Sequence, residues 1–155
     1  MIRCIAAIDE RHGLANDKGI PWQLLTDKHY FREKTEGGIV LMGYKTYEEF
    51  AQPLPNRRNI VASTSQQTVR QGFELIDDAR QFLQQSREDV WVIGGAGLFE
   101  QTLDLAEELY LTQVSGDFHC TKFFPEFKDA FRLVSESKPF SENGISFTFQ
   151  IWRRT

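Results

Sequence analysis

The sequence predicts a single domain of the α/β class. The chain has 155 residues, a length typical of one domain with its own hydrophobic core. Short apolar runs alternate along it with amphipathic stretches, a pattern that indicates strands layered against helices. The sequence contains no repeat, low-complexity tract or linker that would divide it.

The first expected element is a strand over 2–8, which is apolar with little alternation, as in a strand buried on both faces. Residues 9–23 contain two glycines and a proline and are expected to form a long loop. Loops of this length inside a domain are usually functional. The helical spacing of apolar residues predicts a helix over 26–34, and a strand is expected over 39–42.

In the rest of the chain a short helix is expected over 45–50, with Thr46 as a candidate cap. Another helix is expected over 79–85, and Asp77 or Asp78 would cap it well. The remaining expected elements are strands over 59–63, 73–76, 90–93 and 109–114, a helix over 97–103, and a closing antiparallel pair over 131–136 and 145–153. The last segment alternates apolar and polar residues, as a strand with one drier face does.

The composition argues against several classes of function, although a local basic patch stays possible. The net charge of −4 argues against nucleic-acid binding, which usually needs a basic face. The apolar run near the N-terminus is too short for a signal peptide or a membrane span. Cys4 and Cys120 have no ligand or redox spacing, so we expect free thiols in a reducing compartment and no metal site. A cytoplasmic protein without membrane or nucleic-acid partners is therefore expected.

Asp27 is a candidate catalytic acid because it lies in an apolar stretch. It follows Trp22 by five residues and precedes Tyr30 and Phe31, and a carboxylate is costly to bury uncompensated. One interpretation is a solvated acid in the first turn of a helix, where the helix dipole favours it. The other is a proton source in a dry cleft, with a pKa raised by loss of water.

Two glycine-containing turns are candidate phosphate sites. Segment 94–97, Gly-Gly-Ala-Gly, ends an apolar strand where a helix begins. It could bring backbone close to a pyrophosphate, or could be a plain tight turn, since it is not the GxGxxG fingerprint. Segment 43–46, Gly-Tyr-Lys-Thr, closes another strand; Lys45 and Thr46 could hold phosphate or form an ordinary cap with a solvated lysine. An acid in an apolar cleft and a phosphate turn suggest a redox enzyme using a dinucleotide.

Two arginines, Arg57 and Arg58, stand just before an expected strand. A guanidinium fork suits a carboxylate ligand, although surface arginines often serve only solubility. Most aromatic residues are expected in the core, with Phe31 and Phe50 set apart as candidate ring-stacking walls.

Several short motifs follow one another in a characteristic order and spacing. They are Ile5-Ala6-Ala7, Gly19-Ile20-Pro21-Trp22, Asp27 with Phe31, Met42-Gly43-Tyr44-Lys45-Thr46-Tyr47, Pro53-Leu54-Pro55-Asn56-Arg57-Arg58-Asn59, Val92-Ile93-Gly94-Gly95 and Leu109-Tyr110-Leu111-Thr112. Each alone is weak evidence, but the series is specific. Through these motifs the chain resembles the dihydrofolate reductase family over essentially its full length.

With the patterning, the resemblance implies one domain over 1–155. Its expected fold is a mostly parallel, twisted sheet of about eight strands with an antiparallel C-terminal strand and flanking helices. The implied activity is reduction of 7,8-dihydrofolate to 5,6,7,8-tetrahydrofolate by NADPH in one-carbon metabolism. The implied partners are dihydrofolate and antifolate inhibitors, and the implied state is a monomer.

The resemblance also assigns catalytic roles. The acid matching Asp27 hydrogen-bonds the pterin N3 and 2-amino groups and promotes protonation at N5, with a water as donor, while hydride goes to C6. Thr112 would support the acid and a bound water, Trp22 would close the water side, and Ile20 would line the reacting pockets. A dry pocket with one acid suits this chemistry, because hydride transfer to an imine is helped by a protonated nitrogen. The loop over 9–23 is suited to closing over the site.

The implied binding residues form two sets. The substrate set is Ile5, Ala6, Asp27, Lys28, Phe31, Phe50, Leu54, Arg57, Ile93 and Thr112, with Arg57 expected to take the α-carboxylate of the glutamate tail. The cofactor set is Ala7, Leu14, Ile20, Gly43, Tyr44, Lys45, Thr46, Ser63, Thr64, Ile93, Gly94, Gly95, Ala96, Gly97, Leu98 and Phe99. In relatives, a cis peptide joins the residues matching Gly94 and Gly95.

Tyr44 departs from the family, which usually has an arginine there that binds the 2′-phosphate of NADPH. A tyrosine hydroxyl supplies no charge; Thr64, Lys45 and Arg58 are candidate substitutes. We therefore expect use of NADPH with reduced discrimination against NADH.

Other departures leave roles open. Lys28 is either a solvated helix-face lysine or a partner for the γ-carboxylate of the folate tail. Cys120-Thr121 replaces a Gly-Asp pair of some bacterial relatives, so their loop coupling is not assumed. Two other functions stay open: a related pyrimidine reductase of riboflavin synthesis, which lacks the pterin acid, and a binding protein without turnover. Asp27 with Trp22 and Arg57 favours folate.

Overall fold

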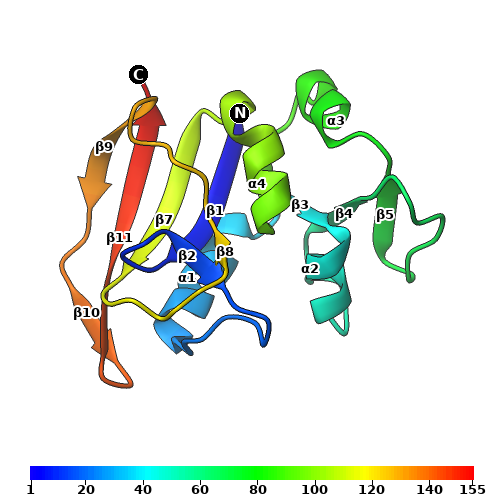
Figure 1. The fold of residues 1–155 in the computed structure, drawn as a ribbon. Coiled ribbons are helices and arrows are strands. Elements are labelled where there is room, and N and C mark those ends of the chain that lie inside the picture. The colour runs from blue at the N-terminus through cyan, green and yellow to red at the C-terminus, as the bar shows by residue number, and fades with distance from the viewer.

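A nine-stranded sheet runs through the computed structural model, which describes residues 1–155 (Figure 1). The strand order is β10-β11-β7-β1-β6-β3-β4-β5, and β9 also pairs with β11. The strands are β1 (Ile2–Ile8), β3 (Ile39–Gly43), β4 (Arg58–Ala62), β5 (Phe73–Ile76), β6 (Val90–Val92), β7 (Glu108–Val114), β9 (Phe131–Glu136), β10 (Phe140–Glu142) and β11 (Ile145–Arg154). A separate two-stranded sheet pairs β2 (Gly13–Ala15) with β8 (Lys122–Phe123).

Six neighbouring strands from β7 to β5 are parallel, and β11 runs antiparallel to β7. This confirms the expected mostly parallel sheet with an antiparallel C-terminal strand. Because parallel strands end at the same edge of a sheet, loops that follow them meet there, and that edge is the usual place for ligands in open α/β sheets.

Helices cover both faces of the sheet (Figure 1). They are α1 (Leu25–Thr35), α2 (Tyr44–Glu49), α3 (Ala79–Gln85) and α4 (Ala96–Thr102), followed by a 3₁₀ turn over Leu103–Leu105. Adjacent residues of β3 show the two faces: Leu41 packs with α3 and α4 residues, whereas Val40 packs with aromatic residues of α1 and α2. Both are fully buried, as expected for a strand covered on both faces.

Local sequence signals explain several boundaries. The expected and observed bounds coincide for β1, β5, α3 and β9, and β9 pairs antiparallel with β11 as expected. Asp78 caps α3, where its Oδ1 accepts a hydrogen bond of 3.0 Å from the Gln81 N–H. The expected cap of α2 by Thr46 is wrong: Gly43 is the capping residue and no side chain bonds there, because Thr46 already lies inside the helix.

Three short strands were not expected. The loop over 9–23 contains β2, and β8 and β10 were not anticipated from the sequence.

Both cysteines are free and buried. None of the helices is both long and apolar enough to traverse a lipid bilayer.

Candidate active site

Asp27 lies in the first turn of α1, beside Thr112 of β7. The Thr112 hydroxyl donates a hydrogen bond of 2.6 Å to Oδ1 of Asp27. Burial raises the pKa of Asp27, and this effect outweighs the opposing hydrogen bond from Thr112. Asp27 is therefore partly withdrawn from water and paired with Thr112, which favours the second interpretation over that of a freely solvated acid.

The expected substrate walls gather in one apolar cluster. Ile5 belongs to the buried core of this cluster, and Phe31, Phe50, Leu54 and Ile93 pack against it. Ile5 lies on β1 and Phe31 on α1. Phe50 and Leu54 lie between α2 and β4, and Ile93 directly follows β6. The structure thus brings together residues far apart in the chain, as a site for a flat aromatic ring requires.

Other sequence-derived site residues have different surroundings. Trp22 is buried edge-on against Phe118, with ring centroids 5.2 Å apart, in a cluster that also contains Ala7. By contrast, Ile20 is 61% exposed. The side chains of Ala6 and Leu14 pack against the cluster of α3 and α4, not against the aromatic one.

Asp9 holds the base of the 9–23 loop, a role the sequence analysis missed. Its buried carboxylate accepts three backbone hydrogen bonds, from Arg11 at 2.9 Å, Gly13 at 2.8 Å and Phe118 at 3.0 Å. Burial favours the protonated form, but these N–H groups outweigh it and lower the pKa of Asp9. The acid directly after an apolar strand was the available signal.

The 9–23 loop is also tied to the segment that follows β7. The Thr121 N–H donates to the Ala15 carbonyl at 2.9 Å, and β2 pairs with β8. Backbone groups therefore join these two segments, and the contact does not depend on the side chains at 120 and 121.

Arg57 has the features of a carboxylate site. Its side chain is only 2% exposed, and its Nη2 lies 3.0 Å from Oε2 of Glu36. Its Nε is buried without a hydrogen-bond partner, and such a group is costly to leave unsatisfied. Lys28, in contrast, lies on the exposed side of α1.

The two glycine turns meet at the ends of β3 and β6. The Gly43 N–H donates to the Gly94 carbonyl at 2.8 Å, and a cis peptide joins Gly94 and Gly95. A Cβ added to Gly95 would lie 3.6 Å from Oγ1 of Thr46, so the starts of α2 and α4 approach each other closely. The first turn of each helix leaves backbone N–H groups without helical partners, and these groups suit a pyrophosphate.

The side chains along α4 do not all face this turn. Leu98 and Phe99 are buried in the core, so only their backbone groups are available to a ligand. Ala96 is partly buried and Gly97 is exposed, and a Cβ added to Gly97 would meet open space. The α4 contribution to a phosphate site therefore comes from its backbone.

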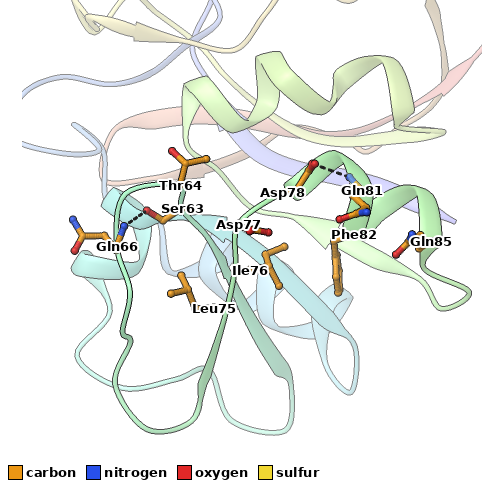
Figure 2. A pocket seen from close by; sticks show the side chains of 10 residues that line it. All are labelled: Ser63, Thr64, Gln66, Leu75, Ile76, Asp77, Asp78, Gln81, Phe82 and Gln85. Carbon is orange, nitrogen blue, oxygen red and sulfur yellow. Dashed lines mark hydrogen bonds between the residues drawn. The ribbon is translucent and has the colours of Figure 1, made fainter.

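A cavity of about 630 Å³ lies beside the ends of β4 and β5 (Figure 2). It is lined by Ser63, Thr64, Gln66, Leu75, Ile76, Asp77, Asp78, Gln81, Phe82 and Gln85. Ser63 and Thr64 thus line a pocket, as the resemblance implies for an adenosine site. The lining has two carboxylates and no lysine or arginine.

Only one of the three candidate replacements for a 2′-phosphate arginine keeps a free positive charge. Arg58 is held by Glu74, whose two carboxylate oxygens both lie 2.8 Å from its guanidinium nitrogens. Thr64 lines the cavity but carries no charge. Lys45 is exposed at the start of α2, next to Tyr44, whose ring lies 5.0 Å from that of Tyr47.

This fold and site are those of an α/β oxidoreductase of the nucleotide-dependent class: a partly buried acid is hydrogen-bonded to Thr112, an apolar cluster contains aromatic residues of the same helix, and a glycine turn lies at the neighbouring strand ends. Comparison with known proteins identifies the family. The family profile described as dihydrofolate reductase matches residues 1–154, and the chain belongs to that family.

Individual relatives agree with this assignment. Dihydrofolate reductase of Bacillus subtilis is 35% identical over 141 residues, covering 89% of this chain and 84% of that one. The Drosophila melanogaster enzyme is 32% identical, covering 95% of this chain and 94% of that protein. The structure of dihydrofolate reductase from Enterococcus faecalis, complexed with NADP(H) and RAB-propyl, superimposes with a TM-score of 0.89 at 24% identity, covering 99% and 96% of the two chains. It confirms the fold.

Proposed function

We propose that this protein reduces 7,8-dihydrofolate to 5,6,7,8-tetrahydrofolate with NADPH, which supplies the hydride when bound. The observation that carries the proposal is the hydrogen-bonded, partly buried Asp27–Thr112 pair, with Phe31 of the same helix in the apolar cluster. Family membership supports the reaction, and the glycine turn and the 630 Å³ cavity fit the pyrophosphate and adenosine of a dinucleotide. The test is the loss of NADPH absorbance on adding dihydrofolate; a protein that binds both without turnover would contradict it.

The residues divide the chemistry among them. Asp27 would bind and orient the polar edge of the pterin, and its raised pKa would keep a proton available near N5. Thr112 fixes the orientation of that carboxyl. Phe31 and Phe50 would enclose the benzoyl ring, and Trp22 with its loop would exclude water, which strengthens polar interactions at the reacting atoms.

Replacing Arg57 with Lys is expected to raise the KM for dihydrofolate about 10- to 100-fold with little change in kcat. A lysine cannot offer the paired N–H groups that bind a carboxylate, and loss of binding alone acts on KM. Steady-state kinetics would measure both constants. The matched control is Arg58→Lys, because Arg58 is exposed and pairs with Glu74; an equal effect in both variants would contradict the role of Arg57.

The cavity predicts weak preference between NADPH and NADH. Its lining offers no cation to a 2′-phosphate, and Lys45 is the one candidate substitute with an unpaired charge, so we expect kcat/KM to favour NADPH over NADH by only a reduced factor. Tyr44→Arg is expected to increase the preference for NADPH by about tenfold, since a charged hydrogen bond to phosphate is worth that much. Parallel assays with both cofactors would measure it, and a wild-type enzyme that rejects NADH would contradict the prediction.

We also propose that the protein acts in the cytoplasm as a monomer. The two buried free thiols suit a reducing compartment, and the family resemblance supports the monomer. Light scattering of the purified protein would measure its mass in solution.

A further inference from the structure

The helix that carries Asp27 is capped by an acid from the far end of the chain. The residue before α1, Leu24, provides no side-chain cap. Instead Glu142, the last residue of β10, accepts from the Leu25 N–H through Oε2 at 2.5 Å and from the Thr26 N–H through Oε1 at 3.1 Å. These two N–H groups belong to the first turn of α1, immediately before Asp27.

The hairpin that presents Glu142 is closely fitted to α1. Its turn is Asn143-Gly144, with φ of 54° and 74°, the left-handed geometry of a tight two-residue hairpin. The Asn143 side-chain amide donates to the Gln23 carbonyl at 2.8 Å, on the segment leading into α1. One turn further along α1, Tyr30 stacks on Phe149 of β11, with ring centroids 4.0 Å apart.

The position of Glu142 changes the electrostatics of the helix start. Free N–H groups at that end would favour the ionised form of an acid in the first turn. Glu142 occupies two of them with a full negative charge, and those bonds lower its own pKa, so it is ionised at neutral pH. The charge of Glu142 in turn adds to the effect of burial in raising the pKa of Asp27.

Few other polar or titratable side chains lie around Glu142 and Asp27. Thr112 faces Asp27 from β7 and carries no charge. Tyr30, on α1, has its pKa raised to about 12 by burial, and so is neutral at physiological pH. His29 lies near Glu142 and lowers the pKa of that carboxyl when protonated, and Lys28 is exposed on α1.

We propose that Glu142 is a positioning residue for Asp27: by accepting from the Leu25 and Thr26 N–H groups it fixes the start of α1 and places a negative charge at the positive end of the helix, directly before Asp27. The proposal rests on the reductase function proposed above. Glu142 touches neither substrate nor cofactor in this scheme, and acts only through Asp27.

The first test is the pH dependence of kcat. In Glu142→Gln the side chain keeps its shape but loses its charge, and the fall of activity with rising pH is expected to begin about 0.3 to 0.7 pH unit lower than in wild type. Glu142→Asp keeps the charge and should restore most of the wild-type profile. The matched control is Glu136→Gln, which removes a charge from the neighbouring β9, where Glu136 bonds Thr148 and Gln150 of β11.

The second test does not depend on turnover. Titration of the Asp27 side-chain carbon by NMR in the free protein should show a lower pKa in Glu142→Gln than in wild type or Glu136→Gln. An unchanged Asp27 pKa in a folded Glu142→Gln variant would overturn the proposal. If instead the wild type does not reduce dihydrofolate, the proposed function fails, and the NMR titration still decides the role of Glu142.

Discussion

Replacing Asp27 with Asn is expected to lower turnover of dihydrofolate by about 10²- to 10³-fold at neutral pH, the usual contribution of a positioned acid. An asparagine oxygen can still accept the Thr112 hydrogen bond made at 2.6 Å, so the local structure should persist. Folate binding should therefore survive while reduction fails. The NADPH absorbance assay would measure the loss, and activity should recover at lower pH, where the substrate is already protonated.

The same substitution is expected to stabilise the protein at neutral pH. The folded-state pKa of Asp27 is raised above its unfolded value, mainly by burial, so ionising Asp27 costs stability as pH rises from about 4 through that folded pKa. Asn removes this cost, and the thermal midpoint of Asp27→Asn should exceed that of wild type at pH 7 and match it below about pH 4. Unchanged activity in the variant would exclude Asp27 as the acid.

The second large effect is expected at Asp9. The Asp9 carboxylate accepts hydrogen bonds from three backbone N–H groups. In Asp9→Asn an amide NH₂, which cannot accept, replaces one of its oxygens, so at least one of these hydrogen bonds is lost. Loss of a buried, charged hydrogen bond costs about 2 to 3 kcal/mol, or about 5 to 10 °C in the thermal midpoint of a domain this size. Calorimetry would measure the shift, and the loosened loop should also raise KM for both substrates.

The pH dependence of this effect has the opposite sign to that of Asp27. Because the folded-state pKa of Asp9 is lowered, its contribution is fully present above the unfolded pKa of about 4 and is lost as pH falls through the folded pKa. Wild type and Asp9→Asn should therefore converge in acid. The control is Asp17→Asn, an exposed acid on the same loop, which should unfold like wild type at every pH.

Local patterns predicted the larger elements of the fold because their causes are local. The β1 run and the Asp78 cap of α3 each depend on residues within a few positions of one another. The short strands β2 and β8 were missed because neither has a pattern of its own. They exist by pairing with each other across a separation of more than a hundred residues, and no local window contains that information.

In the candidate site, too, the features with local causes could be predicted and those that join distant residues could not. Asp27 stood out by its apolar neighbours, and the motif resemblance supplied Thr112 as its partner, a bond the structure contains. Glu142 could not be found this way, since its cap joins residues 116 and 117 positions apart. The Asn143-Gly144 pair was a usable signal for the hairpin, although nothing local indicates that its tip meets α1.

The distant capping of α1 has a consequence for the order of assembly during synthesis. The glycine turns at 43 and 94 and the strands that carry them leave the ribosome well before residues 142–149. Until residues 142–149 emerge, the start of α1 lacks Glu142, and Tyr30 lacks the Phe149 ring. A nascent chain can thus complete its nucleotide side first, and the proton-handling side matures only after residues 142–149 have been synthesised.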